Sequence, residues 1–288
     1  MALSPHLPAP RGLPADDHVH SEWSWDAFAG SMVATCARAV ELGLPSIAFT
    51  EHADFSEWVL PPGVQLPEPW LELVRDGILE PPPLDVASYL ATLAECRDRF
   101  PSLRIVSGVE LSEPHWHDAA TRDLLRRGGF ERILASVHSG SDSTGGTTEL
   151  SVQFEHAPPG DVIRGYLAET ARLIEGFDGF EVLAHVDYPV RYWPSGAAPY
   201  DPAEFEDEHR HVLRLLAGSG RVLEVNTRVP LHPQVVTWWR EEGGRAVSFA
   251  SDAHEPAALA TGFAEAADMV ASAGFRPDSD PHAFWTCG

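Results

Sequence analysis

The sequence is poor in cysteine. It contains three cysteines in 288 residues, Cys36, Cys96 and Cys287, and none stands in a Cys-x-x-Cys pair. This spacing argues against a thiolate zinc site and against a disulfide framework. Cys36 and Cys96 lie in apolar patterns typical of helices, so we expect both thiols to be buried.

Basic residues are also scarce. Lys and Arg together number 20 against 43 Asp and Glu, which gives a formal net charge of −23. A field this negative repels polyanions, so nucleic acid and anionic membrane surfaces are disfavoured as partners. If the substrate is a phosphate ester, metal cations and a few local arginines must overcome this repulsion.

Long hydrophobic runs are absent. No stretch approaches 18 consecutive apolar residues, so no membrane span is predicted. Residues 1–14 contain prolines but no continuous apolar segment, which indicates an N-terminal extension rather than a signal peptide. We therefore expect a cytoplasmic protein. The motifs Gly-x-Ser-x-Gly, the phosphate-binding P-loop and Gly-x-Gly-x-x-Gly after a strand are missing too, which disfavours the enzyme classes that depend on them.

Short β-branched runs alternate with longer helical patterns along the chain. The predicted strands are residues 15–20, 46–50, 104–108, 132–137, 180–184, 222–225 and 246–250. The predicted helices are residues 27–42, 86–99, 116–127, 160–176, 202–219, 233–243 and 255–273. This alternation predicts parallel strands with helices outside, and a TIM-like α/β barrel fits it better than an open, doubly wound sheet. We expect one domain over residues 15–276 and a C-terminal tail over residues 277–288.

Two segments interrupt this rhythm. Residues 57–83 are dense in proline, and residues 139–159 are rich in Gly, Ser and Thr. Both follow predicted strands, which is where barrel enzymes place their active sites. We expect at least one of them to cover the active site, although both could be tolerated surface insertions.

Histidines and carboxylates follow the predicted strands. His18 and His20 close the first strand, and side chains two apart in extended chain point to the same face. A single pair of this kind is unremarkable, but five later strands also end in such groups. These groups are Glu51 and His52, Glu110 and Glu113, His138, His185 and Asp187, and Asp252 and His254.

The carboxyl ends of parallel strands meet at one mouth of a barrel, so these groups are expected to converge. Uncompensated charges gathered there would cost several kcal/mol, which divalent cations would remove. Imidazole and carboxylate ligands without thiolates suit zinc, manganese or iron. A pair of such ions supplies hydroxide from a bound water as a nucleophile, which predicts hydrolysis without a protein nucleophile.

The segments DDHVH, TEHAD, GVELSE, ASVHSG, AHVDYP and SDAH, in this order, resemble the metal-binding motifs of the PHP (polymerase and histidinol phosphatase) superfamily. The resemblance runs from about residue 15 to 275 and is closest to the histidinol-phosphatase branch. It implies a distorted seven-stranded (β/α)7 barrel with two to three divalent metal ions at the carboxyl ends of its strands.

The resemblance also implies a ligand set. The first metal would be held by His18, His20, Glu110 and Asp252. Glu110 would bridge to a second metal that is completed by His138 and His185. The third metal would use Asp26, His52 and His254. Asp26 stands where several family members have histidine, and the histidinol-phosphatase branch also has aspartate there.

The sequence offers fewer candidates for substrate binding than for metal binding. Arg191, six residues after His185, matches a phosphate-binding arginine of that branch, and its guanidinium suits a phosphate dianion. We place Arg191 with Asp252 and His254 among the catalytic residues. Arg228 is a second candidate for binding phosphate, and His156 is a third candidate for contacting the substrate, although each could be an ordinary surface residue.

Other aromatic residues and histidines give weaker indications of a role in the site. Trp23, Trp25 and Trp193 could wall the substrate pocket, and packing at the barrel rim explains them equally well. We expect the remaining helical or turn histidines to be ordinary surface residues. These are His209, His211 and His232.

The first functional hypothesis is therefore hydrolysis of a phosphomonoester, with L-histidinol phosphate as the substrate that the resemblance favours. The alternatives are hydrolysis of another small phosphate ester or nucleotide, and a non-catalytic metal-binding module. An amidohydrolase acting on a substrate without phosphate is a further alternative, but it usually needs a bridging lysine at a strand end, which is missing here. We expect a monomer or a small homo-oligomer.

Replacing His20 with alanine removes one of two imidazoles that face the predicted metal site. We expect phosphatase activity to disappear and the metal content per chain to fall, because a ligand is lost. Phosphate release and metal analysis on the same preparation measure both effects. Full activity in this variant would refute the assignment of His20.

Overall fold

A single curled sheet forms the centre of the protein. The computed structural model describes residues 12–64, 66–141 and 146–288, so most of the predicted extension 1–14 lies outside it. Seven parallel strands lie in the order β1-β2-β6-β7-β10-β11-β12. They are β1 (Asp16–Val19), β2 (Ser46–Ala53), β6 (Arg104–Ser112), β7 (Arg132–Ser136), β10 (Val182–Leu183), β11 (Val222–Asn226) and β12 (Ala246–Ala250).

The sheet curls until its first and last parallel strands meet at their carboxyl ends. A parallel bridge joins Val19 to Ala253, and the His20 N–H donates to the Ala253 carbonyl at 2.9 Å. At the other end of β12, strand β13 (Trp285–Thr286) pairs antiparallel with it. The predicted distorted α/β barrel is thus confirmed, with closure at its mouth. The predicted tail 277–288 carries β13 and therefore extends the same sheet.

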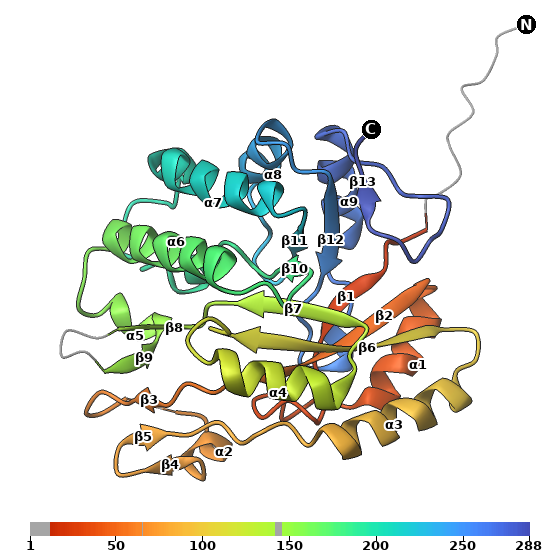
Figure 1. Cartoon of the computed structure of the whole chain (residues 1–288), viewed down its shortest axis with the longest axis horizontal. Coiled ribbons are helices and arrows are strands. Elements are labelled where there is room, and N and C mark those ends of the chain that lie inside the picture. Colours follow the sequence, from red (N-terminus) through yellow and green to blue (C-terminus); the bar gives the residue numbers. More distant parts are fainter. Residues whose placement is uncertain (1–11, 65, 142–145) are drawn as a thin grey trace, which may run out of the picture.

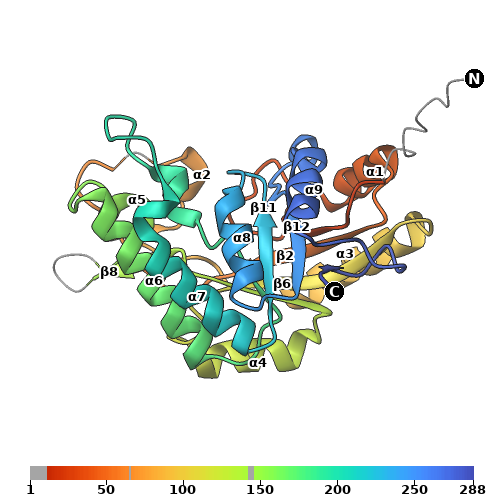
Figure 2. The same cartoon turned by 90° about the horizontal axis from the view of Figure 1, so that it is seen from above.

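Helices lie outside the sheet, as Figures 1 and 2 show. They are α1 (Met32–Leu42), α3 (Val86–Arg99), α4 (Asp118–Gly128), α6 (Pro159–Gly176), α7 (Glu206–Gly218), α8 (Pro233–Glu241) and α9 (Phe263–Ser272). Two short 3-10 helices, η1 (Tyr188–Tyr192) and η2 (Pro202–Phe205), precede α7, and η3 (Pro256–Ala258) precedes α9.

Two helices begin five or more residues later than the sequence predicted. Helix α1 starts at Met32 because the Ser31 hydroxyl caps it by accepting from the Ala34 N–H. This leaves Asp26 in a loop. Helix α9 starts at Phe263, since Ala260 and Gly262 adopt positive φ angles of 54° and 78° that a helix cannot contain.

Two neighbouring strands that carry candidate ligands are held by a buried tyrosine. The Tyr89 hydroxyl donates to the Phe49 carbonyl of β2 at 2.9 Å and accepts from the Gly108 N–H of β6 at 2.8 Å. Gly108 lets β6 pack closely against the Thr50 side chain of β2, because a Cβ at this position would lie 2.6 Å from that side chain. Cys36 and Cys96 are buried in the same apolar cluster as Tyr89, as predicted.

Both interrupting segments have structure of their own. Residues 57–83 form the sheet β3-β5-β4 with helix α2, and residues 139–159 contain the hairpin β8–β9 and helix α5. Strand β3 contacts β9, and the arrows of β6 and β7 in Figure 1 point toward this side of the molecule. The bounds are β3 (Trp58–Val59), α2 (Glu68–Leu71), β4 (Val74–Arg75), β5 (Ile78–Leu79), β8 (Ser139–Ser141), β9 (Thr147–Glu149) and α5 (Leu150–Gln153).

Within the described residues, every helix is too short or too polar to cross a membrane.

Candidate metal centre

His18 and His20, at the end of β1, face each other with their Nε2 atoms. Both side chains are buried, and the two Nε2 atoms lie 3.0 Å apart. The His18 Nδ1–H donates to Glu224 at 2.8 Å, and the His20 Nδ1–H donates to the Ser24 hydroxyl at 2.9 Å. With both Nδ1 atoms occupied as donors, the facing Nε2 atoms present lone pairs that repel unless a proton or a metal cation lies between them.

A second group gathers around Glu110, at the end of β6. The Nε2 atoms of His138 and His185 lie 3.2 Å apart, and each approaches Glu110 Oε1, at 3.3 Å and 2.8 Å respectively. His138 uses its Nδ1 to contact the Ser112 hydroxyl at 2.6 Å. The other carboxylate oxygen of Glu110, Oε2, lies 3.1 Å from the His18 Nε2. Glu110 therefore stands between the two groups, as a bridging ligand would.

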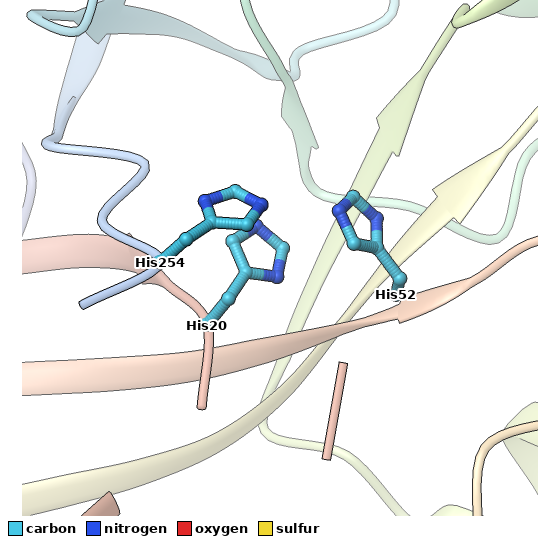
Figure 3. Close-up of side chains that lie close together, drawn as sticks. All are labelled: His20, His52 and His254. Carbon is cyan, nitrogen blue, oxygen red and sulfur yellow. The ribbon is translucent and has the colours of Figure 1, made fainter. Parts of the chain in front are cut away.

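The third group comes from three separate segments. Figure 3 shows the rings of His20, His52 and His254 around one space, with His254 beside His20 and His52 across from them. Ring centroids lie 4.3 Å apart for His20 and His254 and 4.2 Å apart for His20 and His52. Asp26 completes the group, since its carboxylate oxygens lie 3.4 Å from the His52 Nε2 and 3.1 Å from the His254 Nε2.

The predicted ligands thus lie in one cluster of neighbouring side chains, and their donor set fits divalent cations. Four overlapping groups of three residues each bring ligand atoms within 4.8 Å of one another. Asp26 Oδ1 and His52 Nδ1 are buried without a hydrogen-bond partner, which is costly unless a bound ion satisfies them. The groups are His18, His20 and Asp252; Glu110, His138 and His185; His20, His52 and His254; and His52, Asp54 and His138.

The carboxylates of this cluster favour the charged form. Burial alone would raise the pKa of Glu110, but the adjacent His18 and His138 outweigh it and hold that pKa well below the usual range. In the same way, burial would raise the pKa of Asp252, but Arg191 together with the neighbouring histidines outweighs it and holds that pKa well below its ordinary value. Buried negative charge of this kind requires nearby cations.

The pKa values of two imidazoles in the cluster are shifted in opposite directions. Burial disfavours the charged form of His52, but Asp26 and the neighbouring carboxylates outweigh it and raise its pKa to about 10. Burial, reinforced by the positive charges of His52 and His254, lowers the pKa of His20 well below its ordinary value. Protons on some rings thus balance the carboxylates when no ion is bound, and metal ions that bind there must displace them.

A cavity of about 320 Å³ opens over the cluster. Arg191 lies on its wall, pairs with Asp252 and places its guanidinium 4.8 Å from the centre of the Tyr188 ring. Arg228 also lines the cavity, with its Nη1 3.0 Å from the His254 Nδ1 and 3.4 Å from Asp252 Oδ1. Both inserted segments contribute to the lining, so both cover the mouth of the barrel.

Some predicted residues lie elsewhere. His156 is exposed on the inserted segment and is not among the residues that line the cavity. Of the three tryptophans singled out, Trp25 lines the cavity, whereas Trp23 and Trp193 lie outside its lining. His209 is buried rather than exposed: its Nε2 contacts the Tyr200 hydroxyl at 3.0 Å, and burial lowers its pKa to about 4.

The sequence analysis missed Glu224, a buried carboxylate in the middle of β11. Its Oε2 accepts from the His18 Nδ1–H at 2.8 Å, and its Oε1 accepts from the His185 backbone N–H at 3.0 Å. It also accepts from the Asn226 amide at 2.9 Å. Glu224 therefore orients ligands of two groups at once. A glutamate inside the apolar strand VLEVN was the signal that could have revealed it.

Comparison with known proteins shows which family has this sequence pattern. A model of the PHP domain family matches residues 16–228, which is well over half of the chain. The chain belongs to the PHP domain family. The family predicted from the motifs is thus confirmed.

One sequence comparison and one structural comparison show similarity over most of the chain. A histidinol-phosphatase of Lactococcus lactis is 25% identical over 269 residues, which is 91% of this PHP chain and 91% of that protein. The crystal structure of a histidinol phosphate phosphatase of Lactococcus lactis, in complex with zinc, L-histidinol and phosphate, superposes with a TM-score of 0.75 at 22% identity. This superposition covers 91% of this chain and 94% of that one, and it supports the barrel fold of this PHP protein.

Replacing Glu224 with glutamine turns an acceptor toward either His18 or His185 into an amide donor. We expect metal affinity to fall about 10- to 100-fold, because the His18 ring is no longer held in the tautomer that carries its proton on Nδ1 and leaves Nε2 free for a metal ion. Competition with a chelator of known affinity measures the change. Glu181→Gln, at a half-exposed carboxylate that pairs with Arg132, is the matched control. Unchanged metal affinity in the Glu224 variant would contradict the orienting role.

Proposed function

We propose that this PHP protein is a metal-dependent phosphomonoester hydrolase that converts L-histidinol phosphate and water to L-histidinol and phosphate. The observation that carries the proposal is the convergence of imidazoles and carboxylates beneath a cavity whose wall bears two arginines. A phosphate monoester is the substrate that needs both features, since its dianion is bound by cations and guanidinium groups together.

The proposed ligands divide the cluster among two to three ions. His18, His20, Glu110 and Asp252 would hold one ion; Glu110, His138 and His185 a second; and Asp26, His52 and His254 a third. Zinc, manganese and iron all suit nitrogen and carboxylate ligands. When bound, such ions would acidify a coordinated water and withdraw charge from phosphate oxygens.

The arginines are proposed to position the phosphate. Arg191 is held by Asp252 and by the Tyr188 ring, so its guanidinium is fixed before substrate arrives. Arg228 approaches the same carboxylate from the next strand and is half exposed, which leaves it donors for a ligand. Two planar cations on one wall favour a dianion over a neutral ester. Hydrolysis then joins the water oxygen to phosphorus, breaks the bond from phosphorus to the alcohol oxygen, and returns a proton to that oxygen.

The choice of L-histidinol phosphate rests on the relatives. The Lactococcus lactis relatives carry the name of this activity and, in the crystal structure, L-histidinol and phosphate themselves. The similarity to them extends over nearly the whole chain rather than over the metal motifs alone.

A panel of phosphate monoesters tests the proposal. We expect phosphate release to be fastest from L-histidinol phosphate, to disappear after treatment with a chelator, and to return when zinc or manganese is added. Phosphate assays and metal analysis on the same preparation provide the measurement. A metal-loaded protein that releases no phosphate from any monoester would exclude the proposed function.

Replacing Arg191 with alanine removes one phosphate donor from the cavity wall. We expect KM for L-histidinol phosphate to rise by about tenfold or more, because a charge-assisted hydrogen bond to the dianion is lost. Steady-state kinetics measure the effect, and Arg38→Ala, at an exposed pair on α1, is the control. If KM and kcat both stay within twofold of the unmodified protein, Arg191 does not bind the phosphate.

A further inference from the structure

Glu113 lies beside the metal cluster without belonging to its proposed ligands. It follows β6, three residues after Glu110, and is 0% exposed. Its φ angle is 42°, a left-handed backbone conformation that strains a residue with a side chain. The Glu113 N–H donates to the Ser136 carbonyl of β7 at 3.0 Å. Strain of this kind persists only where the surrounding contacts enforce it.

The carboxylate of Glu113 accepts four hydrogen bonds, two at each oxygen. Its Oε1 accepts from the backbone N–H groups of His138 at 2.6 Å and Ser139 at 2.8 Å. Its Oε2 accepts from the hydroxyls of Ser139 at 3.0 Å and Ser56 at 3.1 Å. A carboxylate offers about four acceptor positions, so the protein itself uses all of them. Glu113 therefore has no acceptor left for a metal ion or a substrate.

These donors lie where the inserted segments leave the barrel. Ser56 immediately precedes residues 57–83, and Ser139 begins residues 139–159. The Ser139 hydroxyl also accepts from the Trp58 indole N–H at 2.8 Å, which joins the two segments to each other. One carboxylate thus holds the starts of both segments.

His138 connects Glu113 to the metal cluster. Its backbone N–H donates to Glu113, and its carbonyl accepts from the Leu150 N–H of α5 at 3.0 Å. Its Nδ1 contacts the Ser112 hydroxyl at 2.6 Å, while its Nε2 faces Glu110. The same backbone therefore sets the position of a proposed ligand and the position of the second inserted segment.

Residues held in this way form part of the cavity wall. Trp58 and Glu149 line the cavity, and Glu149 lies opposite Ser139 in the register of β8 and β9. Strand β3, which carries Trp58, also contacts β9. A shift at the starts of the segments would therefore displace the cavity wall and His138 together.

We infer that Glu113 is a positioning residue, which joins both inserted segments to His138 and so sets the shape of the cavity over the metal cluster. It acts through hydrogen bonds to backbone and hydroxyl groups, because its oxygens are fully bonded within the protein. The kinetic consequence of this inference rests on the proposed function, since it requires a phosphate ester in the cavity. The structural consequence is independent of turnover.

The variant Glu113→Ala removes all four hydrogen bonds. In the metal-loaded protein we expect amide hydrogen exchange to become about tenfold faster or more in residues 57–64 and 147–157 together, because bonds to a charged acceptor are lost. We expect metal affinity to fall about tenfold or more as His138 loses its backbone partner. With metal in excess, we expect KM for L-histidinol phosphate to rise about tenfold and kcat to fall less, because the cavity wall loosens while the ions are retained.

Two milder variants separate the parts of this arrangement. Glu113→Gln keeps an oxygen that accepts from both backbone N–H groups, and its amide donates to hydroxyls that can rotate to accept. We expect it to preserve slow exchange and metal affinity. Ser56→Ala removes only the bond to the first segment. We expect it to speed exchange in residues 57–64 and to leave residues 147–157 unchanged.

Glu131→Ala is the matched control, because Glu131 is also a carboxylate that joins neighbouring strands. It accepts from the Ser107 backbone N–H at 3.2 Å and from the Ser107 hydroxyl at 3.0 Å, where β7 begins. We expect this variant to lower overall stability without changing exchange in the inserted segments, metal affinity or KM. Mass spectrometry of exchanged peptides, competition with a chelator and steady-state kinetics measure the three effects.

Exchange in both segments that stays as slow in Glu113→Ala as in the unmodified protein would overturn the inference. Equal acceleration in Glu131→Ala would also overturn it, since a general loss of stability would then explain the effect. The same holds if Glu113→Gln behaves like Glu113→Ala. If Glu113→Ala does not fold, Ser56→Ala decides: acceleration confined to residues 57–64 supports the inference, and unchanged exchange overturns it. None of these outcomes requires phosphate release, so the panel of esters detects a failure of the proposed function separately.

Discussion

The structure depends on the balance of charge around Glu110. This carboxylate is buried between imidazoles of separate strands, with His18 3.1 Å from one of its oxygens and His185 2.8 Å from the other. A buried carboxylate without compensating positive charge is strongly destabilising. The mouth of the barrel can therefore exist only with protons or metal ions in it, and the low pKa of Glu110 together with the high pKa of His52 expresses this requirement.

The fold provides the rigid frame that this balance needs. The first and last parallel strands meet at the mouth, where backbone hydrogen bonds join His20 to Ala253 and Asp252 to His18. Ligands from the two ends of the chain are thereby locked together. Glu224 adds a second connection, since it binds both the His18 ring and the His185 backbone. Several ligands thus depend on backbone contacts or on a second carboxylate for their orientation, and the ions would occupy a prepared site.

The inserted segments contribute aromatic and acidic side chains to the lining of the cavity. The barrel strands and the segments that follow them supply the candidate ligands and the arginines, whereas residues 57–83 and 139–159 supply Trp58, Trp70 and Glu149. Such a division lets one metal chemistry serve different substrates, because the loops can vary while the ligand-bearing strand ends remain. Membership of the PHP domain family accounts for the first part.

The sequence by itself determined the strand ends and the ligand types. Alternating apolar runs located the parallel strands, and the spacing of His18 and His20 placed two imidazoles on one face, because side-chain direction in a strand follows local geometry. Contacts between distant segments were decided only by the tertiary structure. The pairing of Glu224 with His18 spans 206 positions, and the burial of His209 depends on helix packing. Likewise, a local pattern that predicted a tail after residue 276 could not show β13, since a short strand forms only when a partner edge is available.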